Sequence, residues 1–167
     1  SMPLGLFAEA GHERGGVFYP MQTFSKERAV DFSRVHFFVE ASRSEDATVL
    51  HDMALRLTGD GALVHDSNAA LRRRLHLAAV FCCNFVNRLY GITADLLAEH
   101  GIPFSTMLPL IHETADKVDE LTPSEAQTGP AVRWDEAVME QQMALLDVDK
   151  RALYQLISKS IHDFAII

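Results

Sequence analysis

The stretch Leu75–Asn87, LHLAAVFCCNFVN, separates a part of the sequence with strand patterns from a part with helical patterns only. A helix built from it is apolar on every side, and the helical pattern extends in both directions, from about Asn68 to about Glu99. At 1.5 Å per residue such a helix is on the order of 45 Å long, more than one small domain needs. Because a helix that is apolar all round needs neighbours on all sides, we predict a homodimer whose interface includes this helix.

The residues before the long helix follow a different pattern, in which short runs of β-branched and aromatic residues are separated by glycine or polar turns. These runs predict strands at Gly16–Tyr19, Val35–Glu40 and Ala62–His65. Helical spacing predicts a helix over Glu45–Leu57, with Ser44 as its N-cap. The order strand, helix, strand indicates a crossover unit, which belongs to a sheet covered by helices.

The residues after the long helix predict three further helices. They are Pro103–Leu121, Trp134–Leu146 and a last helix that begins near Asp149. A polar loop, residues 122–130, separates the first of these from the second. Long loops on rigid helices often carry binding residues, so this loop is a candidate binding segment.

These patterns together predict an α+β fold with two parts. Residues 3–67 contain the strands, and residues 68–167 form an all-α domain, for which Ser67 is the predicted N-cap. With 167 residues, of which 48% are hydrophobic, the chain can bury a sizeable core.

Composition argues against several kinds of partner. The net charge is −8 and the 15 Lys and Arg residues are scattered, so no nucleic-acid partner is expected. The most apolar stretch, Leu75–Val86, is shorter than the roughly 20 residues that cross a bilayer, so no membrane span is expected. The neighbouring Cys82 and Cys83 are poorly placed for a disulfide, and no secretory signal opens the chain, which indicates a cytoplasmic setting.

Metal and phosphate sites are not expected from the sequence either. The eight histidines include no pair at the helical spacing typical of zinc ligands, and neither cysteine has a partner at ligand spacing. No glycine-rich phosphate loop occurs, because Gly15-Gly16 lacks the remaining glycine and precedes a strand.

Two polar residues interrupt the apolar centre of the long helix and are candidate catalytic residues. His76 and Asn84 are eight positions apart, which on a straight α-helix places them about 80° apart in azimuth and roughly 12 Å apart along the axis. His76 is a candidate proton donor and Asn84 a candidate hydrogen-bond partner of the substrate. Asn87 lies about one helical turn beyond Asn84 and is a candidate substrate-binding residue on the same side of the helix. The alternative is that these polar side chains are satisfied inside a helical interface.

Arginines at the start of the long helix also have two interpretations. Arg72, Arg73 and Arg74 lie at the electropositive end, where the helix dipole disfavours cations. Either one of them clamps an anionic ligand, or they form a solvated basic face that pairs with nearby Glu or Asp residues.

The segment Gln127–Pro130 followed by Arg133 combines an amide, a hydroxyl, an unhindered backbone and a guanidinium. Thr128, Gly129 and Arg133 therefore suit recognition of a substrate carboxylate. The alternative is that Gly-Pro simply marks a turn.

Two pairs of motifs carry a resemblance to a known family. They are Tyr19–Ser25 (YPMQTFS) with Val35–Glu40 (VHFFVE), and Leu75–Asn87 with Glu125–Arg133 (EAQTGPAVR). From Leu4 to its end the chain resembles a bacterial family of NADP-dependent oxidoreductases. The members have a Rossmann-like domain followed by a helical domain of unknown function. The family is similar to pyrroline-5-carboxylate reductase and, more distantly, to hydroxyacid dehydrogenases of the 6-phosphogluconate type.

The resemblance implies about a hundred further residues in front, which carry the first βαβ unit and its glycine loop. On this basis residues 3–67 are the C-terminal part of a Rossmann-like NADP-binding domain. The resemblance implies that Pro20, Gln22 and Thr23 lie on the cofactor side, and that the helix from His76 and the loop from Thr128 face the cofactor. Many members have His where this chain has Tyr19.

The sequence thus favours the C-terminal portion of an NADP-dependent reductase that acts on a small carbonyl or imine metabolite. The intact protein would bind NADP, and this chain alone would be inactive because the amides that hold the pyrophosphate are missing. The alternative is a non-catalytic protein whose helical domain serves dimerisation or partner binding.

Overall fold

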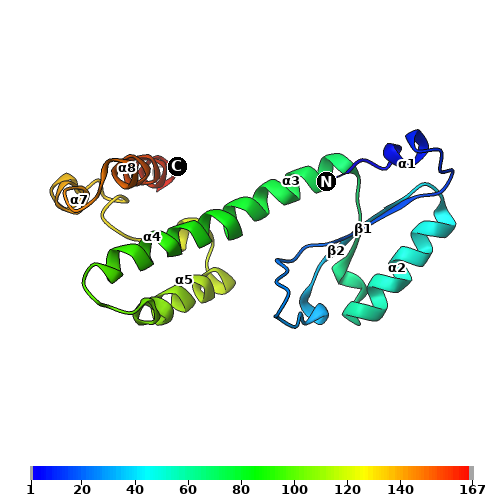
Figure 1. Ribbon diagram of the computed structural model, residues 1–167, viewed down its shortest axis with the longest axis horizontal. Helices are drawn as coiled ribbons and strands as arrows, with labels where there is room; N and C mark the ends of the chain where they lie inside the picture. Colours follow the sequence, from blue (N-terminus) through cyan, green and yellow to red (C-terminus); the bar gives the residue numbers. More distant parts are fainter. Residues whose placement is uncertain (1, 166–167) are drawn as a thin grey trace. The chain divides into compact units, whose positions relative to one another are not determined.

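The computed structural model describes residues 2–165, whose contacts separate two units (Figure 1). The first unit is Ser1–Arg88 and contains the sheet, and the second is Leu89–Ile167 and is helical. The predicted α+β class is confirmed. The domain boundary predicted at residue 68 stays a prediction, and α3 (Ala69–Ala79) belongs by its contacts to the unit with the sheet.

The sheet of the first unit has three strands in the order β1 (Gly16–Pro20), β2 (Phe37–Ala41) and β3 (Val64–Asp66). β1 is antiparallel to β2 with Tyr19 opposite Phe38, and β2 is parallel to β3 with Phe38 opposite His65. Since side chains alternate along a strand, Tyr19, Phe38 and His65 share one face of the sheet.

The opposite face of the sheet is covered by α2 (Ser44–Thr58) and forms the core. Val35, Phe37 and Ala54 are at most 1% exposed, and the ring of Phe18 lies 4.9 Å from that of Phe37. The predicted strand–helix–strand order is therefore confirmed, because β2, α2 and the parallel β3 make one crossover unit.

Several element ends differ from the prediction. The third strand begins at Val64 rather than Ala62, because a 3-10 turn, η2 (Gly61–Leu63), precedes it and Asp60 caps that turn. The predicted N-cap of α2 is wrong, since Ser44 is already helical and Arg43 stands at the cap position without a side-chain cap bond. Short elements that were not predicted are α1 (Gly5–Glu9) and η1 (Phe32–Arg34).

The predicted long helix is confirmed, and it has an interruption that was not predicted. It consists of α3, a π-helical turn η3 (Val80–Phe85) and α4 (Val86–Ala98), which together make one helix of 30 residues. Its N-cap is Asn68, not Ser67, because the Asn68 side chain accepts from the Leu71 amide at 2.8 Å. The Ser67 hydroxyl instead donates to the Val39 carbonyl at 3.0 Å.

Within residues 2–165, this helix is also the one element long and apolar enough to cross a membrane by length and composition. Its mean hydropathy reaches 1.3 over 18 residues, and none of that window is buried. The apolar part of the helix is thus longer than Leu75–Val86, the stretch on which the expectation of no membrane span depends.

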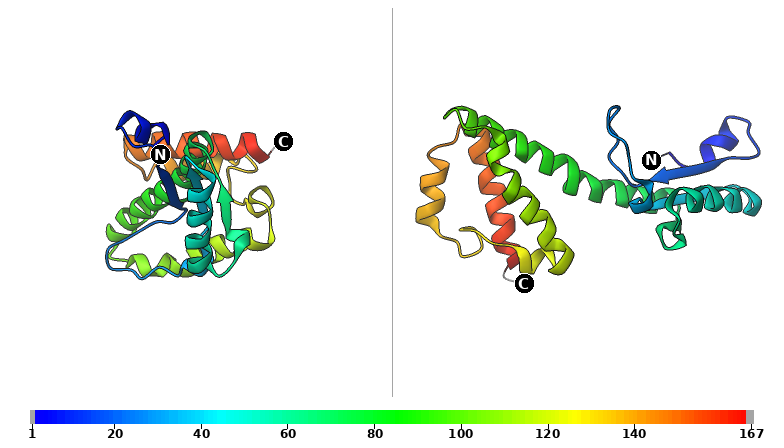
Figure 2. Two further views of the ribbon diagram at one scale, coloured as in Figure 1. Left: turned by 90° about the vertical axis from the view of Figure 1, so that its right-hand side faces the viewer. Right: turned by 90° about the horizontal axis from the view of Figure 1, so that it is seen from below.

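The second unit contains helices only among its described residues (Figure 2). After α4 follow η4 (Phe104–Met107), α5 (Leu108–Glu120), α6 (Pro123–Ala126), α7 (Glu136–Met143) and α8 (Val148–Ala165). Part of the predicted loop is thus a short helix, α6, which a capping box of Thr122 and Glu125 starts. The helix predicted from Trp134 begins two residues later, since Trp134 has a φ of 51°.

Candidate functional site

The start of α3 contacts the sheet face opposite α2 through a buried arginine. Arg72 is 0% exposed, and its Nη1 lies 2.6 Å from Oε2 of Glu40 on β2. It also donates to the Ser67 hydroxyl at 3.0 Å and to the Met2 carbonyl at 3.1 Å. Arg72 thus pairs with a glutamate, as the second sequence interpretation expected, but it is buried rather than solvated and is not free to clamp an anionic ligand. Arg73 and Arg74 are exposed.

His76, the predicted proton donor, lies one helical turn after Arg72 and contacts the same sheet face. Its Nδ1 is 3.5 Å from the hydroxyl of Tyr19 on β1. His76 is exposed and Tyr19 is half-buried. The structure thus adds a partner for His76 that the sequence analysis did not identify.

The π-helical turn changes the predicted geometry of His76 and Asn84. A π turn accommodates one residue more than an α turn, so the azimuth between the two side chains falls from roughly 80° towards roughly 20°. Both residues are exposed, as is Asn87. His76 and Asn84 therefore face one side more closely than a regular helix would allow. π turns occur frequently at functional sites.

The predicted cofactor residues follow Tyr19 directly. Pro20 is the last residue of β1, and Gln22 and Thr23 are exposed just beyond it. The Gln22 Oε1 accepts from the Thr23 amide at 2.7 Å, which folds this segment into a local turn. The structure therefore places the cofactor-side candidates at the end of β1, next to the tyrosine that contacts His76.

The same sheet face carries two histidines that the sequence did not bring together. His36 Nδ1 lies 2.8 Å from His65 Nε2, and the His65 ring stacks on Phe38 at 4.9 Å. Their separation of 29 positions gave no spacing signal. Within the described residues, no group of three or more potential ligands could hold a metal ion.

The neighbouring cysteines in the π turn are free thiols, with their sulfur atoms 3.6 Å apart. The hydrogen bond with Cys82 raises the pKa of the Cys83 thiol, and burial adds to this effect. A raised pKa disfavours the thiolate, the nucleophilic form, so Cys83 is a poor candidate for covalent catalysis.

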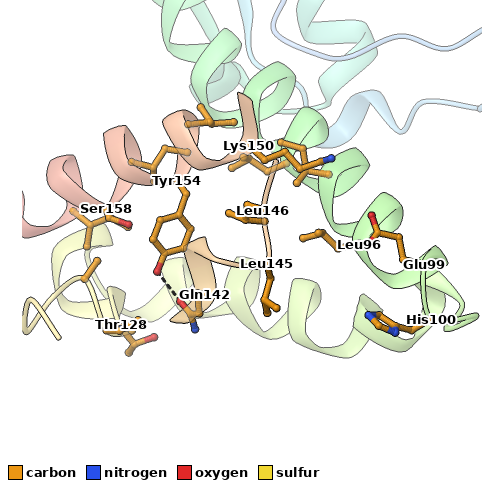
Figure 3. A pocket seen from close by; sticks show the side chains of 18 residues that line it. Leu96, Glu99, His100, Thr128, Gln142, Leu145, Leu146, Lys150, Tyr154 and Ser158 are labelled. Atoms are coloured by element: carbon orange, nitrogen blue, oxygen red, sulfur yellow. Dashed lines mark hydrogen bonds between the residues drawn. The ribbon is translucent and has the colours of Figure 1, made fainter. Parts of the chain in front are cut away.

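The second unit contains a cavity of about 700 Å³ between α4, α7, α8 and the loop at residues 128–131 (Figure 3). Leucine and isoleucine side chains line it together with polar and charged ones, which include Glu99, His100 and Lys150. The Tyr154 hydroxyl, also in the lining, donates to Gln142 Oε1 at 2.6 Å. Thr128 and Gly129, two predicted substrate residues, line this cavity. Arg133 is exposed and is not among its lining residues.

The loop that carries these candidates has a constrained backbone. Gly129 has a φ of 114°, a conformation that essentially only glycine adopts, and Trp134 has a φ of 51°, which is rare for a bulky residue. Trp134 donates from Nε1 to Glu136 Oε1 at 3.0 Å, and its ring lies 4.8 Å from that of His162. Strained backbone of this kind is often found at ligand sites, which supports the interpretation of this loop as a binding segment.

Fold and site together define an α+β protein in which a helical unit follows a small mixed sheet. The chain belongs to the family described as a domain of unknown function, DUF2520, whose profile matches residues 35–161. The resemblance found in the sequence is confirmed. The search of curated proteins gave no match.

Two crystal structures are similar to this chain. A Bacteroides fragilis protein, named as a candidate NADP oxidoreductase, is 49% identical with a TM-score of 0.92 over 98% of this chain. A Thermotoga maritima protein is 20% identical with a TM-score of 0.75 over 99% of the chain, which shows the fold alone. The chain spans 62% and 66% of the lengths of these two proteins.

Proposed function

We propose that this chain is the rear portion of an NADP-dependent oxidoreductase that reduces a small carbonyl or imine compound. The observation that carries the proposal is the 49% identity to a protein whose name calls it an NADP oxidoreductase. The contact of His76 with Tyr19, beside the end of β1, supports it, because a proton donor is needed where the reduction takes place.

In this proposal the segment that binds the nucleotide phosphates lies in a part of the longer protein that this chain does not span, since the chain covers 62% of the Bacteroides fragilis protein. No glycine-rich phosphate loop occurs in the sequence, and within the described residues β1 is paired on one edge only. In dinucleotide-binding domains, the backbone amides at a helix N-terminus bind the pyrophosphate. The sheet of such a domain has more strands than the three described here. We therefore expect the chain alone to be inactive and to lack measurable affinity for NADPH.

In this proposal the residues of the first unit fit the nicotinamide end of the cofactor. Pro20, Gln22 and Thr23 hold that end, since they are accessible at the tip of β1. The bound cofactor supplies a hydride. His76 delivers the proton to the oxygen or nitrogen that receives the electron pair, and Asn84 hydrogen-bonds the substrate.

For the substrate, the proposal assigns Asn87 within the first unit. Within the second unit it separately assigns Thr128, Gly129 and Arg133. The Thr128 hydroxyl and the open backbone at Gly129 border the apolar cavity, which suits a small molecule with an apolar part. Arg133 supplies the planar guanidinium that pairs with a carboxylate.

The proposal includes a homodimer, because the second unit leaves much apolar surface uncovered. Of its described residues only two apolar ones, Ala131 and Met139, are buried. Leu145, Val148 and Leu156 are each at least 70% exposed. Large apolar side chains left this exposed are what a partner surface would cover.

The long helix, where the sequence predicts the dimer interface, also fits a second copy of the chain better than lipid. Between Ala69 and Ala98 it carries the polar His76, Asn84 and Arg88, and such residues are costly in a bilayer centre. A protein partner can accommodate them by hydrogen bonds. We therefore propose a cytoplasmic homodimer, a setting in which Cys82 and Cys83 stay reduced.

A titration with NADPH tests the cofactor proposal. We expect no binding to this 167-residue chain and micromolar binding to a longer protein that also contains the segment equivalent to the part of the relative that this chain does not span. Consumption of NADPH with a panel of small carbonyl and imine compounds then identifies the substrate. Micromolar binding to this chain alone would refute the proposal that the nucleotide-binding segment lies outside it. Absence of binding to the longer protein would favour the non-catalytic alternative, a helical dimerisation or partner-binding protein.

A further inference from the structure

We infer that Tyr19 is a positioning residue for His76: its hydroxyl donates to Nδ1 and so places the imidazole proton on Nε2. The inference rests on the proposed function only in one respect, namely that Nε2 delivers its proton to a substrate. The contact itself is a property of the first unit, in which the two groups lie 3.5 Å apart.

The sheet register determines where the Tyr19 side chain points. Tyr19 pairs with Phe38 in the antiparallel β1–β2 ladder, and its side chain leaves the sheet on the face opposite α2. A tyrosine ring has few rotatable bonds, so its hydroxyl is held within a small volume above this face.

A second, independent tether holds the helix that carries His76. Arg72 and His76 are four residues apart, so they lie on the same side of α3. Arg72 is fixed by its buried ion pair with Glu40, which lies on the same sheet face as Phe38. The helix is thus fastened one turn before His76, and the imidazole is directed at Tyr19.

The assignment of donor and acceptor follows from the chemistry of the two groups. A tyrosine hydroxyl ordinarily keeps its proton at neutral pH and is the more acidic partner, whereas a neutral imidazole has one nitrogen that accepts. When Nδ1 accepts from Tyr19, the ring proton is on Nε2. His76 is exposed, so Nε2 can reach a ligand.

This arrangement gives a balanced proton transfer. The Nε2 proton moves to the substrate oxygen or nitrogen that has received the electron pair of the hydride. The Tyr19 hydroxyl proton moves to Nδ1, so that the imidazole stays neutral. Water then reprotonates the phenolate. A phenol is a much stronger acid than an alcohol, so this direction of transfer is favourable.

The inference is tested by the nitrogen-15 chemical shifts of the His76 ring in the 167-residue chain. A nitrogen that accepts a hydrogen bond moves to lower frequency, so we expect Nδ1 to return to higher frequency in Tyr19→Phe. A fluorinated tyrosine at position 19, whose more acidic hydroxyl is a stronger donor, should move Nδ1 further to lower frequency. Tyr154→Phe, which removes a hydroxyl from the second unit, is the matched control and should leave His76 unchanged.

Two results would overturn the inference. One is a His76 ring whose shifts are the same in the wild type and in Tyr19→Phe. The other is an Nδ1 that resonates in the range of a protonated ring nitrogen, which would make Tyr19 the acceptor. The fluorinated protein keeps the hydroxyl and the shape of the ring, so it remains informative if Tyr19→Phe does not fold.

Kinetics of the longer protein separate this inference from the proposed function. Tyr19→Phe should lower kcat by about tenfold or more and leave KM nearly unchanged, because it removes only part of an acid catalyst that contributes on the order of 10²–10⁴-fold. An inactive wild-type longer protein would refute the proposed function without affecting the chemical-shift result. An active one in which Tyr19→Phe keeps its full kcat would refute the role of Tyr19.

Discussion

The two units of this chain are stabilised in different ways. The first has a small core in which Val35, Phe37, Val39 and Ala54 are at most 1% exposed, and a buried ion pair fastens α3 to the sheet. The second has helices of normal length but little buried apolar surface of its own. Regular helices therefore do not show that a unit buries enough apolar surface by itself. The apolar side chains that stay exposed on the helices indicate where a partner packs against them.

The largest expected effect concerns the ion pair of the first unit. Arg72→Met should destabilise this unit by about 3–5 kcal/mol, because it leaves the Glu40 carboxylate partly buried without its partner. Urea denaturation followed by near-ultraviolet circular dichroism measures the change. Arg73→Met, on the exposed side of the same helix, should change stability by less than about 0.5 kcal/mol.

A double substitution sharpens this first prediction. Replacing Arg72 by Met together with Glu40 by Leu should recover most of the lost stability, since removing both charges avoids the unpaired one. If the double variant is as unstable as the single one, the ion pair is not the reason for the loss.

The next effect concerns the cover of the second unit. Leu156→Asp should dissociate the proposed dimer, because burying an unpaired charge in the interface costs several kcal/mol. Light scattering measures the mass, and the first unit should keep its denaturation curve. Gln155→Asp adds the same charge about 100° around α8 and serves as the control. A dimer that survives Leu156→Asp would show that this face is not the interface.

A smaller effect is expected at the constrained loop of the second unit. Gly129→Ala should cost on the order of 1–3 kcal/mol, since a φ of 114° strains any residue with a Cβ. No atom lies within 4 Å of the added methyl group, so the cost comes from the backbone alone. Ala126→Gly, at a nearby helical position, is the comparison, and thermal unfolding of both variants distinguishes strain from general sensitivity of this segment.

The smallest effect is a dependence of stability on pH at α6. Hydrogen bonds from the Thr122 hydroxyl and from the Thr122 backbone lower the pKa of the Glu125 carboxyl. The stabilisation by Glu125 is therefore complete above the usual glutamate pKa and is lost as the pH falls through the lowered value. Glu125→Gln should reduce this loss in acid, which unfolding at a series of pH values measures. If the loss of stability at acid pH is the same in Glu125→Gln as in the wild type, the capping box does not contribute to the pH dependence.

The ends of the helices and the π turn could not be predicted from neighbouring residues in the sequence. The N-cap of the long helix is Asn68, because the Ser67 hydroxyl donates to the carbonyl of Val39, a residue that is distant in sequence, and accepts from Arg72. The π turn at Val80–Phe85 gave no signal in the sequence, since five of its six residues are apolar and no residue type marks the change in helix type. Its effect on the azimuth of Asn84 could be found only from the backbone.

The sequence by itself determined the α+β class, the crossover unit, the long helix and the family, because these depend on hydrophobic periodicity and on contiguous motifs. The tertiary structure decided the partners of His76 and Arg72. Tyr19 and His76 are 57 positions apart, and no local pattern shows which strand register and which helix azimuth will bring two such side chains together. Those are set by packing between elements, which depends on the whole first unit at once.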